Sequence, residues 1–311
     1  MTGPQWTLEE IPDLSERRAL VTGVTSGLGE HTVLELARRG AEVVMAARSA
    51  GKLEQAVDAV RRALPQAVLV PLIVDLADLS SVRRAAEEAG RLGPLDILVN
   101  NAGVMATPHR RTSDGFELQM GTNHFGHFAL TGLLWPQLVA AESARVVTVS
   151  SQMHRIARAV PQGDPRHDAG GRYERWTAYA QSKLANLLFA FELERRARAA
   201  GTKVQSNAAH PGYARTNLQR TGPGMGSGRS QAAILLGVTR LVGQPADLGA
   251  LPTLMAATMP GLPGGSYVGP RGPLESRGLP TVVKASRVAN DAELARRWWE
   301  LSEEATRVHF P

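Results

Sequence analysis

We predict an α/β fold in which a doubly wound parallel sheet is covered by helices on both faces. Three features of the 311-residue sequence predict it. Short apolar runs alternate with runs of helical period, the apolar runs are hydrophobic throughout, and a glycine-containing turn joins the first of them to the first helix. Fully apolar strands indicate a sheet buried on both faces, and right-handed β/α alternation makes the strands parallel.

The first strand, turn and helix lie within residues 18–40. Residues 19–21 form an apolar run, and apolar residues recur at helical spacing over 33–37. Between them the chain must turn sharply and let a ligand approach the backbone, while the next helix offers free N–H groups and a positive dipole end. We expect a pyrophosphate here, although an ordinary strand-to-helix turn is the alternative for this stretch alone. The residues expected to contact it are Gly23, Thr25, Ser26, Gly27, Leu28 and Gly29.

The same alternation continues to residue 149. Because the carboxyl ends of parallel strands meet at one edge of the sheet, the ligand site should lie there, where the βα loops gather. The predicted strands are 42–47, 67–74, 95–99 and 145–149, and the predicted helices are 51–64, 79–89 and 116–138.

The second half of the chain is less regular. A polar stretch over 152–176 has the composition of an insertion, and a glycine-dense segment over 221–229 leads into the apolar run 232–242. Glycine is hard to fix in one conformation and the apolar run should not remain in water, so we expect a lid over 221–242. The other expected elements are helices at 178–199, 247–257 and 291–307 and strands at 204–209 and 266–268.

No linker divides the chain convincingly, so we predict one domain over 1–311, with a cofactor-binding half at 18–150 and a second half at 151–311 that carries the catalytic helix, the flap and the C-terminal helix. The absence of cysteine excludes disulfides, thiolate metal sites and cysteine nucleophiles. The formal charge of +6 is scattered along helices, which favours solvated helix faces and no nucleic acid. With no leader and no apolar run long enough for a membrane span, we expect a cytoplasmic protein.

The end of the second strand bears on the choice of cofactor. Ala47 stands where an NAD enzyme would place a carboxylate against the ribose 2′-hydroxyl, and Arg48 follows it. A guanidinium there can pair with a 2′-phosphate, so this position predicts NADP(H), with Ser26 and Ser49 as hydroxyl helpers. A solvent-facing arginine at the strand end is the alternative interpretation.

Two further strand ends carry candidate cofactor residues. Asp75, followed by Leu76, could accept a hydrogen bond from an adenine amino group or could cap the next helix. After the fourth strand come Asn101, Ala102 and Gly103, whose small side chains at 102 and 103 would let the backbone lie against a ribose. Without the other motifs this sequence would be a plain turn.

Tyr179 and Lys183 are the most specific candidates for chemistry. Four residues apart, they project from one face of the predicted helix, so the ammonium can lie near the phenol. Together with an oxidised nicotinamide, that charge could lower the pKa of the tyrosine from its ordinary value near 10. Ser151 follows the fifth strand and could hold a substrate carbonyl oxygen, whereas Ser150 completes the strand or caps the turn. Asn123 could hold a water or open its helix locally.

These motifs resemble those of the classical short-chain dehydrogenase/reductase family, in its retinol-dehydrogenase-like and protochlorophyllide-reductase-like branch. TGVTSGLG, Asp75-Leu76, NNAG, Asn123, Ser151, YAQSK and HPG occur in the family's order over roughly 18–220. The resemblance implies a Rossmann-type fold and a catalytic tetrad of Asn123, Ser151, Tyr179 and Lys183. It implies that Tyr179 transfers the proton, Ser151 orients the carbonyl, Lys183 lowers the tyrosine pKa and holds the nicotinamide ribose, and Asn123 supports a relay water. It also places Pro211 and Thr216 near the nicotinamide carboxamide.

The chain departs from the family pattern in two respects. Ser151 and Tyr179 lie 28 positions apart, more than twice the usual interval, and the extra residues precede a helix that often forms the family's dimer interface. Monomer and homodimer therefore both remain open. The lack of cysteine counts against protochlorophyllide reduction. His124 and His127 have no third ligand at metal spacing, so we predict no metal, and Trp298 and Trp299 should pack the last helix onto the domain.

The sequence thus predicts an NADP(H)-dependent oxidoreductase that interconverts an alcohol and its aldehyde or ketone. The aliphatic residues of 232–242 suggest an apolar small-molecule substrate. One alternative is a catalytically idle NADP-sensing or interaction protein on the same fold, which would not need all four catalytic side chains. Another is the epimerase or dehydratase chemistry of the extended branch, against which the TGxxxGxG spacing argues.

Overall fold

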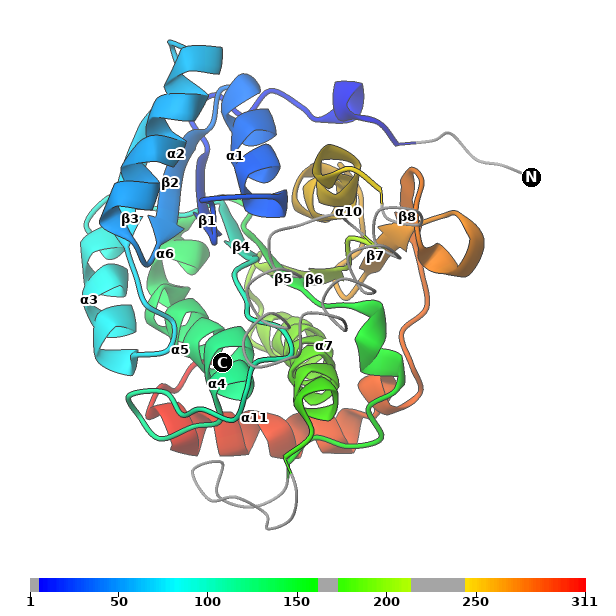
Figure 1. Cartoon of the computed structure of the whole chain (residues 1–311). Coiled ribbons are helices and arrows are strands. Elements are labelled where there is room, and N and C mark those ends of the chain that lie inside the picture. The colour runs from blue at the N-terminus through cyan, green and yellow to red at the C-terminus, as the bar shows by residue number, and fades with distance from the viewer. Residues whose placement is uncertain (1–5, 162–172, 214–243) are drawn as a thin grey trace.

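The computed structural model describes residues 6–161, 173–213 and 244–311. In these ranges the chain forms an eight-stranded sheet with the order β3-β2-β1-β4-β5-β6-β7-β8 (Figure 1). Neighbouring strands are parallel except β8, which is antiparallel to β7. The predicted doubly wound α/β fold is confirmed. The strands are β1 (Arg18–Thr22), β2 (Glu42–Ala47), β3 (Leu69–Ile73), β4 (Ile97–Asn100), β5 (Arg145–Val149), β6 (Gln205–Ala209), β7 (Tyr267–Pro270) and β8 (Pro280–Val282).

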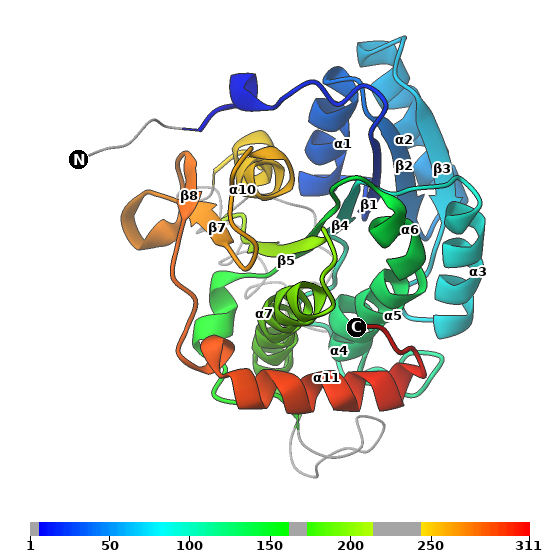
Figure 2. The ribbon, with the colours of Figure 1, turned by 180° about the vertical axis from the view of Figure 1, so that it is seen from behind.

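Helices cover both faces of the sheet. Helices α1 (Leu28–Arg38), α2 (Ala50–Ala63) and α10 (Ala246–Thr258) pack on one face. Helices α3 (Leu79–Gly90), α5 (Gly126–Leu133), α6 (Trp135–Ala140) and α7 (Arg175–Ala199) pack on the other. Helix α11 (Ala292–Thr306) lies outside α5 and α7, on the side away from the sheet (Figure 2).

Successive residues of the central strands enter different cores. In β1, Leu20 belongs to the core beneath α3, α5 and α7, whereas Ala19 and Val21 belong to the core beneath α1, α2 and α10. Side chains of a strand alternate between the two faces of its sheet, so a strand covered on both faces must be apolar at every position. The uninterrupted apolar runs of the sequence have this origin.

One predicted helix is wrong in detail. The apolar spacing over 116–138 indicated a single helix, but the structure divides it into α4 (Leu118–Met120), a π-helical turn (Gly121–Phe125), α5 and α6. Pro136 stands in the first turn of α6, because proline has no N–H to donate and obstructs the preceding turn of a continuous helix. Strand β8 was not predicted, since it has only three residues and begins with Pro280.

The last helix packs as predicted. Trp298 and Trp299 are buried, and the guanidinium of Arg196 on α7 lies over the Trp299 ring, 4.6 Å from its centroid. This contact joins α11 to the long helix that carries Tyr179. None of the helices that the structure describes combines the length and the hydrophobicity that crossing a membrane requires.

Candidate active site

A cavity of about 700 Å³ lies at the carboxyl ends of β1, β2, β4, β5 and β6. Of the predicted site residues in the described ranges, all line it except Gly27, which caps the start of α1, Ser49, which precedes α2, and Asn123, which is buried behind the wall. Thr216 and the predicted lid at 221–242 lie outside the described residues. The predicted residues that line the cavity are Gly23, Thr25, Ser26, Leu28, Gly29, Arg48, Asp75, Leu76, Asn101, Ala102, Gly103, Ser151, Tyr179, Lys183 and Pro211.

The ends of β1 and β4 are joined through one hydroxyl group. The Thr22 hydroxyl accepts hydrogen bonds from the backbone N–H groups of Asn101 and Ala102, both at 3.0 Å. Its own hydrogen is directed to Nε2 of His127 at 2.9 Å, because Nδ1 of that ring donates to the carbonyl of Asn123 at 3.0 Å. The amide of Asn101 also donates to the Thr22 carbonyl at 2.7 Å. The Thr22 hydroxyl thus links the loop that follows β4 to the buried His127 ring.

The glycines of this side lie so close to neighbouring protein atoms that a side chain would not fit. A Cβ at Gly23 would lie 2.8 Å from Cα of Ala102, and a Cβ at Gly29 would lie 2.3 Å from the carbonyl oxygen of Gly23. A Cβ at Gly103 would lie 3.0 Å from Oδ1 of Asn123. The start of α1 meets the cavity at Leu28 and Gly29. Bare backbone beside a helix N-terminus fits the pyrophosphate and ribose of a dinucleotide.

Arg48 and Asp75 stand at one end of the cavity. Arg48 Nη1 lies 4.0 Å from Oδ2 of Asp75, and the Arg48 side chain is 73% exposed, so their attraction is weak and the guanidinium is available to a ligand. Asp75 accepts from the backbone N–H of Ala77. The cap of α3 is Asp78, which accepts from the N–H groups of Ser80 and Ser81. The interpretation of Asp75 as a helix cap is therefore wrong.

Helix α7 brings Tyr179 and Lys183 to the other end of the cavity, beside Ser151. The Lys183 ammonium donates to the carbonyl of Val149 at 3.1 Å and lies 5.8 Å from the centroid of the Tyr179 ring. Both side chains are buried. The Ser151 hydroxyl accepts from the N–H of Met153 at 3.3 Å, which leaves its hydrogen free to be donated. Ser150 completes the strand end, and its hydroxyl donates to the Lys183 carbonyl at 2.7 Å.

Burial shifts both ionisable groups of this cluster. Burial raises the pKa of Tyr179 to about 12, and hydrogen bonding to Ser151 acts in the opposite direction. Burial also lowers the pKa of Lys183 to about 8. Removal from water disfavours the charged form of either group, so the phenol is protonated at neutral pH. The expected lowering of the tyrosine pKa is therefore not provided by the environment of the phenol in the protein alone.

Asn123 lies in the π-helical turn and holds the loop that follows β4. Its Oδ1 accepts from the N–H of Val104 at 2.8 Å, and its amide donates to the carbonyl of Val104 and to the hydroxyl of Ser182, both at 2.9 Å. Both amide hydrogens are used within the protein. The widened turn is typical of π-helical insertions at functional sites, and it agrees with the expectation that Asn123 opens the helix locally.

His124 and His127 are buried among aromatic and backbone groups. His124 contacts the hydroxyl of Ser302 at 2.8 Å, and burial lowers the pKa of His124 to about 3 and that of His127 to about 4. Within the ranges described, no three His, Cys, Asp or Glu side chains come together in an arrangement suited to a metal ion.

Comparisons with known proteins agree with this geometry. The family model described as short chain dehydrogenase matches residues 17–161. Retinol dehydrogenase 13 of Homo sapiens is 38% identical over 301 residues, which cover 95% of this chain and 86% of that protein. The chain is a member of the short-chain dehydrogenase/reductase family. It is also similar to Polyprenol dehydrogenase of Mus musculus, with 40% identity over 93% of this chain and 83% of that protein. The match to Retinol dehydrogenase 14 of Homo sapiens, 41% identical, spans 63% of that protein's length.

A solved structure gives the same result for the whole fold. An uncharacterized protein from Mycobacterium Paratuberculosis superposes with a TM-score of 0.80 at 43% identity, over 99% of this chain and 100% of that one. The chain is thus an oxidoreductase of this family, in its retinol-dehydrogenase-like branch. The similarity extends through the C-terminal residues that lie beyond the family model.

Sequence reasoning missed several residues of this short-chain dehydrogenase site. Trp176 and Leu274 line the cavity, and Glu275 and Arg155 lie in hydrogen-bonded contact behind it. Trp176 stands just before the recognised YAQSK motif. For Leu274 and Glu275 no local signal exists, because their segment has neither a motif nor a helical or strand periodicity. The remaining unpredicted lining residues are Thr22, Ala46, Ala47, Val74, Val104, Met105, Thr122, Val149, Ser150, Gln152, Met153, Gly212, Tyr213 and Ser276.

Proposed function

We propose that the chain is an NADP(H)-dependent oxidoreductase that interconverts an alcohol and its aldehyde or ketone, on an apolar substrate. The observation that carries this proposal is the position of Ser151, Tyr179 and Lys183 on one wall of the cavity whose other end is built from bare backbone. Two hydroxyl groups on the same wall as a buried ammonium can bind and protonate a carbonyl oxygen. The bare backbone can hold the dinucleotide that supplies or accepts the hydride.

Ser151 and Tyr179 would act on the substrate oxygen. Ser151 donates a hydrogen bond to that oxygen, since its hydroxyl hydrogen is not used by the Met153 contact. Tyr179 donates its proton as negative charge develops, and its raised pKa keeps that proton available at neutral pH. The Lys183 ammonium, held by the Val149 carbonyl, stabilises the phenolate that remains. Asn123 holds the loop after β4 in place, which keeps the cofactor-side backbone at a fixed position relative to the two hydroxyls.

The preference for NADP(H) rests on Ala47 and Arg48. No carboxylate follows the buried part of β2, and the exposed Arg48 side chain lines the cavity. A structural relative supports this choice. A protein from Beutenbergia cavernae described as an NAD(P) dependent gluconate 5-dehydrogenase is 25% identical, with a TM-score of 0.60 over 79% of this chain and 91% of that one, and was solved with NADP bound at low occupancy.

The apolar substrate is inferred from the cavity and from the relatives. Val104, Met105, Met153, Trp176 and Leu274 line the same cavity as Ser151 and Tyr179. Two relatives are named for the dehydrogenation of retinol and of a polyprenol, which are long apolar alcohols. Apolar walls with a few polar groups at one point are the usual composition of such a binding site.

Oxidation of NADPH with a panel of aldehydes and ketones tests the proposal. The panel should contain all-trans-retinal, straight-chain alkanals of increasing length and a polar sugar aldehyde of similar reactivity. We expect turnover with the long apolar members and little with the sugar. Binding of NADPH without oxidation by any member would instead favour the alternative, an idle NADP-binding sensor.

A further inference from the structure

The connection between β7 and β8 forms one wall of the cavity. It contains a single 3-10 turn (Pro273–Glu275), coloured orange in Figure 1. Leu274 and Ser276 line the cavity, and the Leu274 residue is 93% exposed, the largest exposure among the large apolar residues that the structure describes. An apolar ligand that covers a fully exposed leucine at the edge of a substrate cavity is bound more tightly, because covering the side chain removes apolar surface from water.

The backbone of this turn is in an unfavourable conformation. Leu274 has φ 52° and ψ 25°, and Glu275 has φ 52°, so two consecutive residues with side chains occupy the left-handed region. Each such residue is strained and persists only where its surroundings impose it. Two contacts hold the turn to neighbouring loops: the amide of Gln152 donates to the Leu274 carbonyl at 3.2 Å, and the N–H of Tyr213 donates to the Ser276 carbonyl at 2.8 Å.

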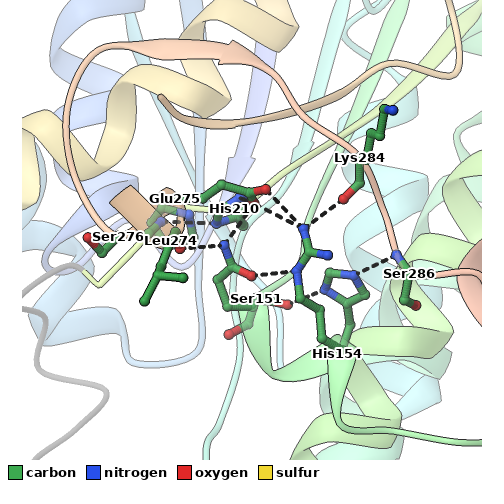
Figure 3. A network of polar contacts seen from close by, with 12 residues as sticks. Ser151, His154, His210, Leu274, Glu275, Ser276, Lys284 and Ser286 are labelled. Atoms are coloured by element: carbon green, nitrogen blue, oxygen red, sulfur yellow. Dashed lines mark hydrogen bonds and ion pairs between the residues drawn. The ribbon is translucent and has the colours of Figure 1, made fainter. Parts of the chain in front are cut away.

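The carboxylate of Glu275 fixes the turn most firmly (Figure 3). It accepts hydrogen bonds from the Gln152 amide at 2.7 Å, from Arg155 Nη2 at 3.0 Å and from Nε2 of His210 at 3.1 Å. Arg155 also donates to the carbonyl of Lys284 at 2.7 Å. The hydrogen bond from His210 and the charge of Arg155 lower the pKa of Glu275 to about 2.

His210 is buried, and its hydrogen bonds define which ring nitrogen carries the proton. The N–H of Gly212 donates to Nδ1 at 3.2 Å, so Nδ1 is an acceptor and the hydrogen lies on Nε2, facing Glu275. Gly269 closes the space on the other side, because a Cβ there would lie 2.0 Å from Nε2. The loop after β6 and the turn after β7 are therefore held to each other through the His210 ring, which lies against Gly269.

We propose that the 273–276 turn is the contact for the apolar part of the substrate, with Leu274 as the specificity-determining side chain and Glu275 as the positioning residue that holds it. In Figure 3 the Leu274 side chain points away from the polar network. The network joins the turn to Ser151 through Gln152, the next residue, so the apolar contact keeps a fixed relation to the catalytic hydroxyl. This inference rests on the proposed alcohol and carbonyl function.

Binding of straight-chain methyl ketones tests the role of Leu274 without requiring turnover. Affinities of hexan-2-one and dodecan-2-one are measured by calorimetry, on the protein with and without saturating NADP⁺. The variant is Leu274→Asn, since asparagine accepts the left-handed conformation. We expect the affinity for dodecan-2-one to fall about five- to thirtyfold, with little change for hexan-2-one. The matched control is Leu248→Asn, because Leu248 is 39% exposed but does not line the cavity.

Glu275→Gln tests positioning. Gln152, Arg155 and His210 all donate hydrogen bonds to the Glu275 carboxylate. The NH₂ group of a glutamine cannot accept from them, so the turn should be held less firmly. We expect the affinity for dodecan-2-one to fall by a similar factor while the affinity for NADP⁺ stays within about twofold. On a confirmed substrate KM should rise with little change in kcat. Glu275→Asp keeps the charge and should recover at least part of the loss, which a purely steric role would not predict.

The outcomes separate this inference from the proposed function. Wild-type affinity that does not increase with ketone length, or a Leu274→Asn variant that keeps the full increase, overturns the inference, even if the enzyme reduces ketones. A chain-length gain that depends on Leu274 supports it, even if no ketone is reduced, in which case the proposed function fails alone. Equal losses in the Leu248→Asn control would also overturn it.

Discussion

The two ends of the cavity are held in place by different kinds of contact. At the cofactor end, β1 and β4 are joined by backbone groups that donate to the Thr22 hydroxyl. The turn after β1 and the start of α1 lie so close to their neighbours that only glycine fits at 23 and 29. At the substrate end, the wall around Leu274 is held by side chains from distant parts of the chain: Arg155 and Glu275 are 120 positions apart, and His210 and Glu275 are 65 apart.

This difference has a consequence for what each end can tolerate. Backbone contacts at van der Waals distance leave no alternative residue, so the cofactor end should lose both stability and binding when a glycine is replaced. A wall held by exchangeable side chains can be altered without moving the strands, which is how one fold serves several substrates. The following predictions test that contrast, beginning with Tyr179 at the substrate end.

Tyr179→Phe should have the largest effect. The substitution deletes the proton donor and keeps the ring that packs in the wall, so turnover should fall by about 10²-fold or more while the dissociation constant of NADPH stays within about twofold. Single-turnover and steady-state rates on a confirmed substrate, together with a fluorescence titration of NADPH, measure both quantities. Tyr173→Phe is the control, since Tyr173 does not line the cavity and its hydroxyl contacts Glu117 and Gln119. A Tyr179→Phe enzyme that kept a tenth of the wild-type rate would show that another group supplies the proton.

Gly29→Ala should break the cofactor end. The new methyl group would lie 2.3 Å from the Gly23 carbonyl oxygen and 2.7 Å from the Asn101 amide, so the turn must shift. We expect the free energy of unfolding to fall by about 1–3 kcal/mol, and NADPH affinity to fall with it. Gly51→Ala, in the first turn of α2, meets no atom within 4 Å and should instead raise stability by up to about 1 kcal/mol. Urea unfolding of both variants checks the contrast, and a stable Gly29→Ala protein would remove the argument for a backbone-built end.

The same contrast explains how far the sequence led. Gly23, Gly29, Asn101 and Gly103 are local to strand ends, and the geometry requires their small or amide side chains, so short motifs were enough to place them. Tyr179 and Lys183 share a helix face, which spacing alone predicts.

The substrate end could not be predicted in this way. Its contacts join 151–155, 210–213 and 274–276, and no periodicity within any one segment indicates the other two. The missed strand β8 and the division of the predicted helix at 116–138 have a related cause. A three-residue strand beginning with proline carries no pattern, and the π-helical turn around Asn123 depends on hydrogen bonds to Val104 and Ser182 that only the fold brings together.

Arg48→Ala tests the part of the cofactor end where a side chain, rather than the backbone, would contact the cofactor. Because Arg48 is 73% exposed, its contact with a 2′-phosphate is partly screened by solvent, so we expect a loss of about tenfold in NADPH affinity with NADH affinity unchanged. Parallel titrations of both cofactors measure the ratio. Lys52→Ala is a control on the neighbouring exposed turn of α2. An unchanged ratio in Arg48→Ala, or a wild-type preference for NADH, would contradict the assignment of NADP(H).

His154→Gln should have the smallest effect, visible only as a change in acid sensitivity. His154 is buried beside the substrate end, where its Nδ1 donates to the Ser151 carbonyl at 2.7 Å and its Nε2 accepts from the N–H of Ser286 at 3.2 Å. Burial lowers its pKa from the ordinary value of 6.5 to about 4. Between pH 6.5 and 4 the unfolded chain therefore binds a proton here that the folded chain does not, and stability falls as the pH falls through this window.

The variant removes this proton uptake by the unfolded chain. The loss of unfolding free energy between about pH 7.0 and 5.5 should therefore be smaller in His154→Gln than in the wild type, by about 1 kcal/mol. Urea unfolding at the two pH values gives the difference directly and cancels the stability that the substitution costs at both. His127→Gln, at the buried junction of the cofactor end, should flatten the dependence similarly, since burial lowers the pKa of His127 to about 4 as well. If only His127→Gln flattened the dependence, the hydrogen bonds that hold His154 would not persist in solution, and the substrate end would be looser than its side-chain network indicates.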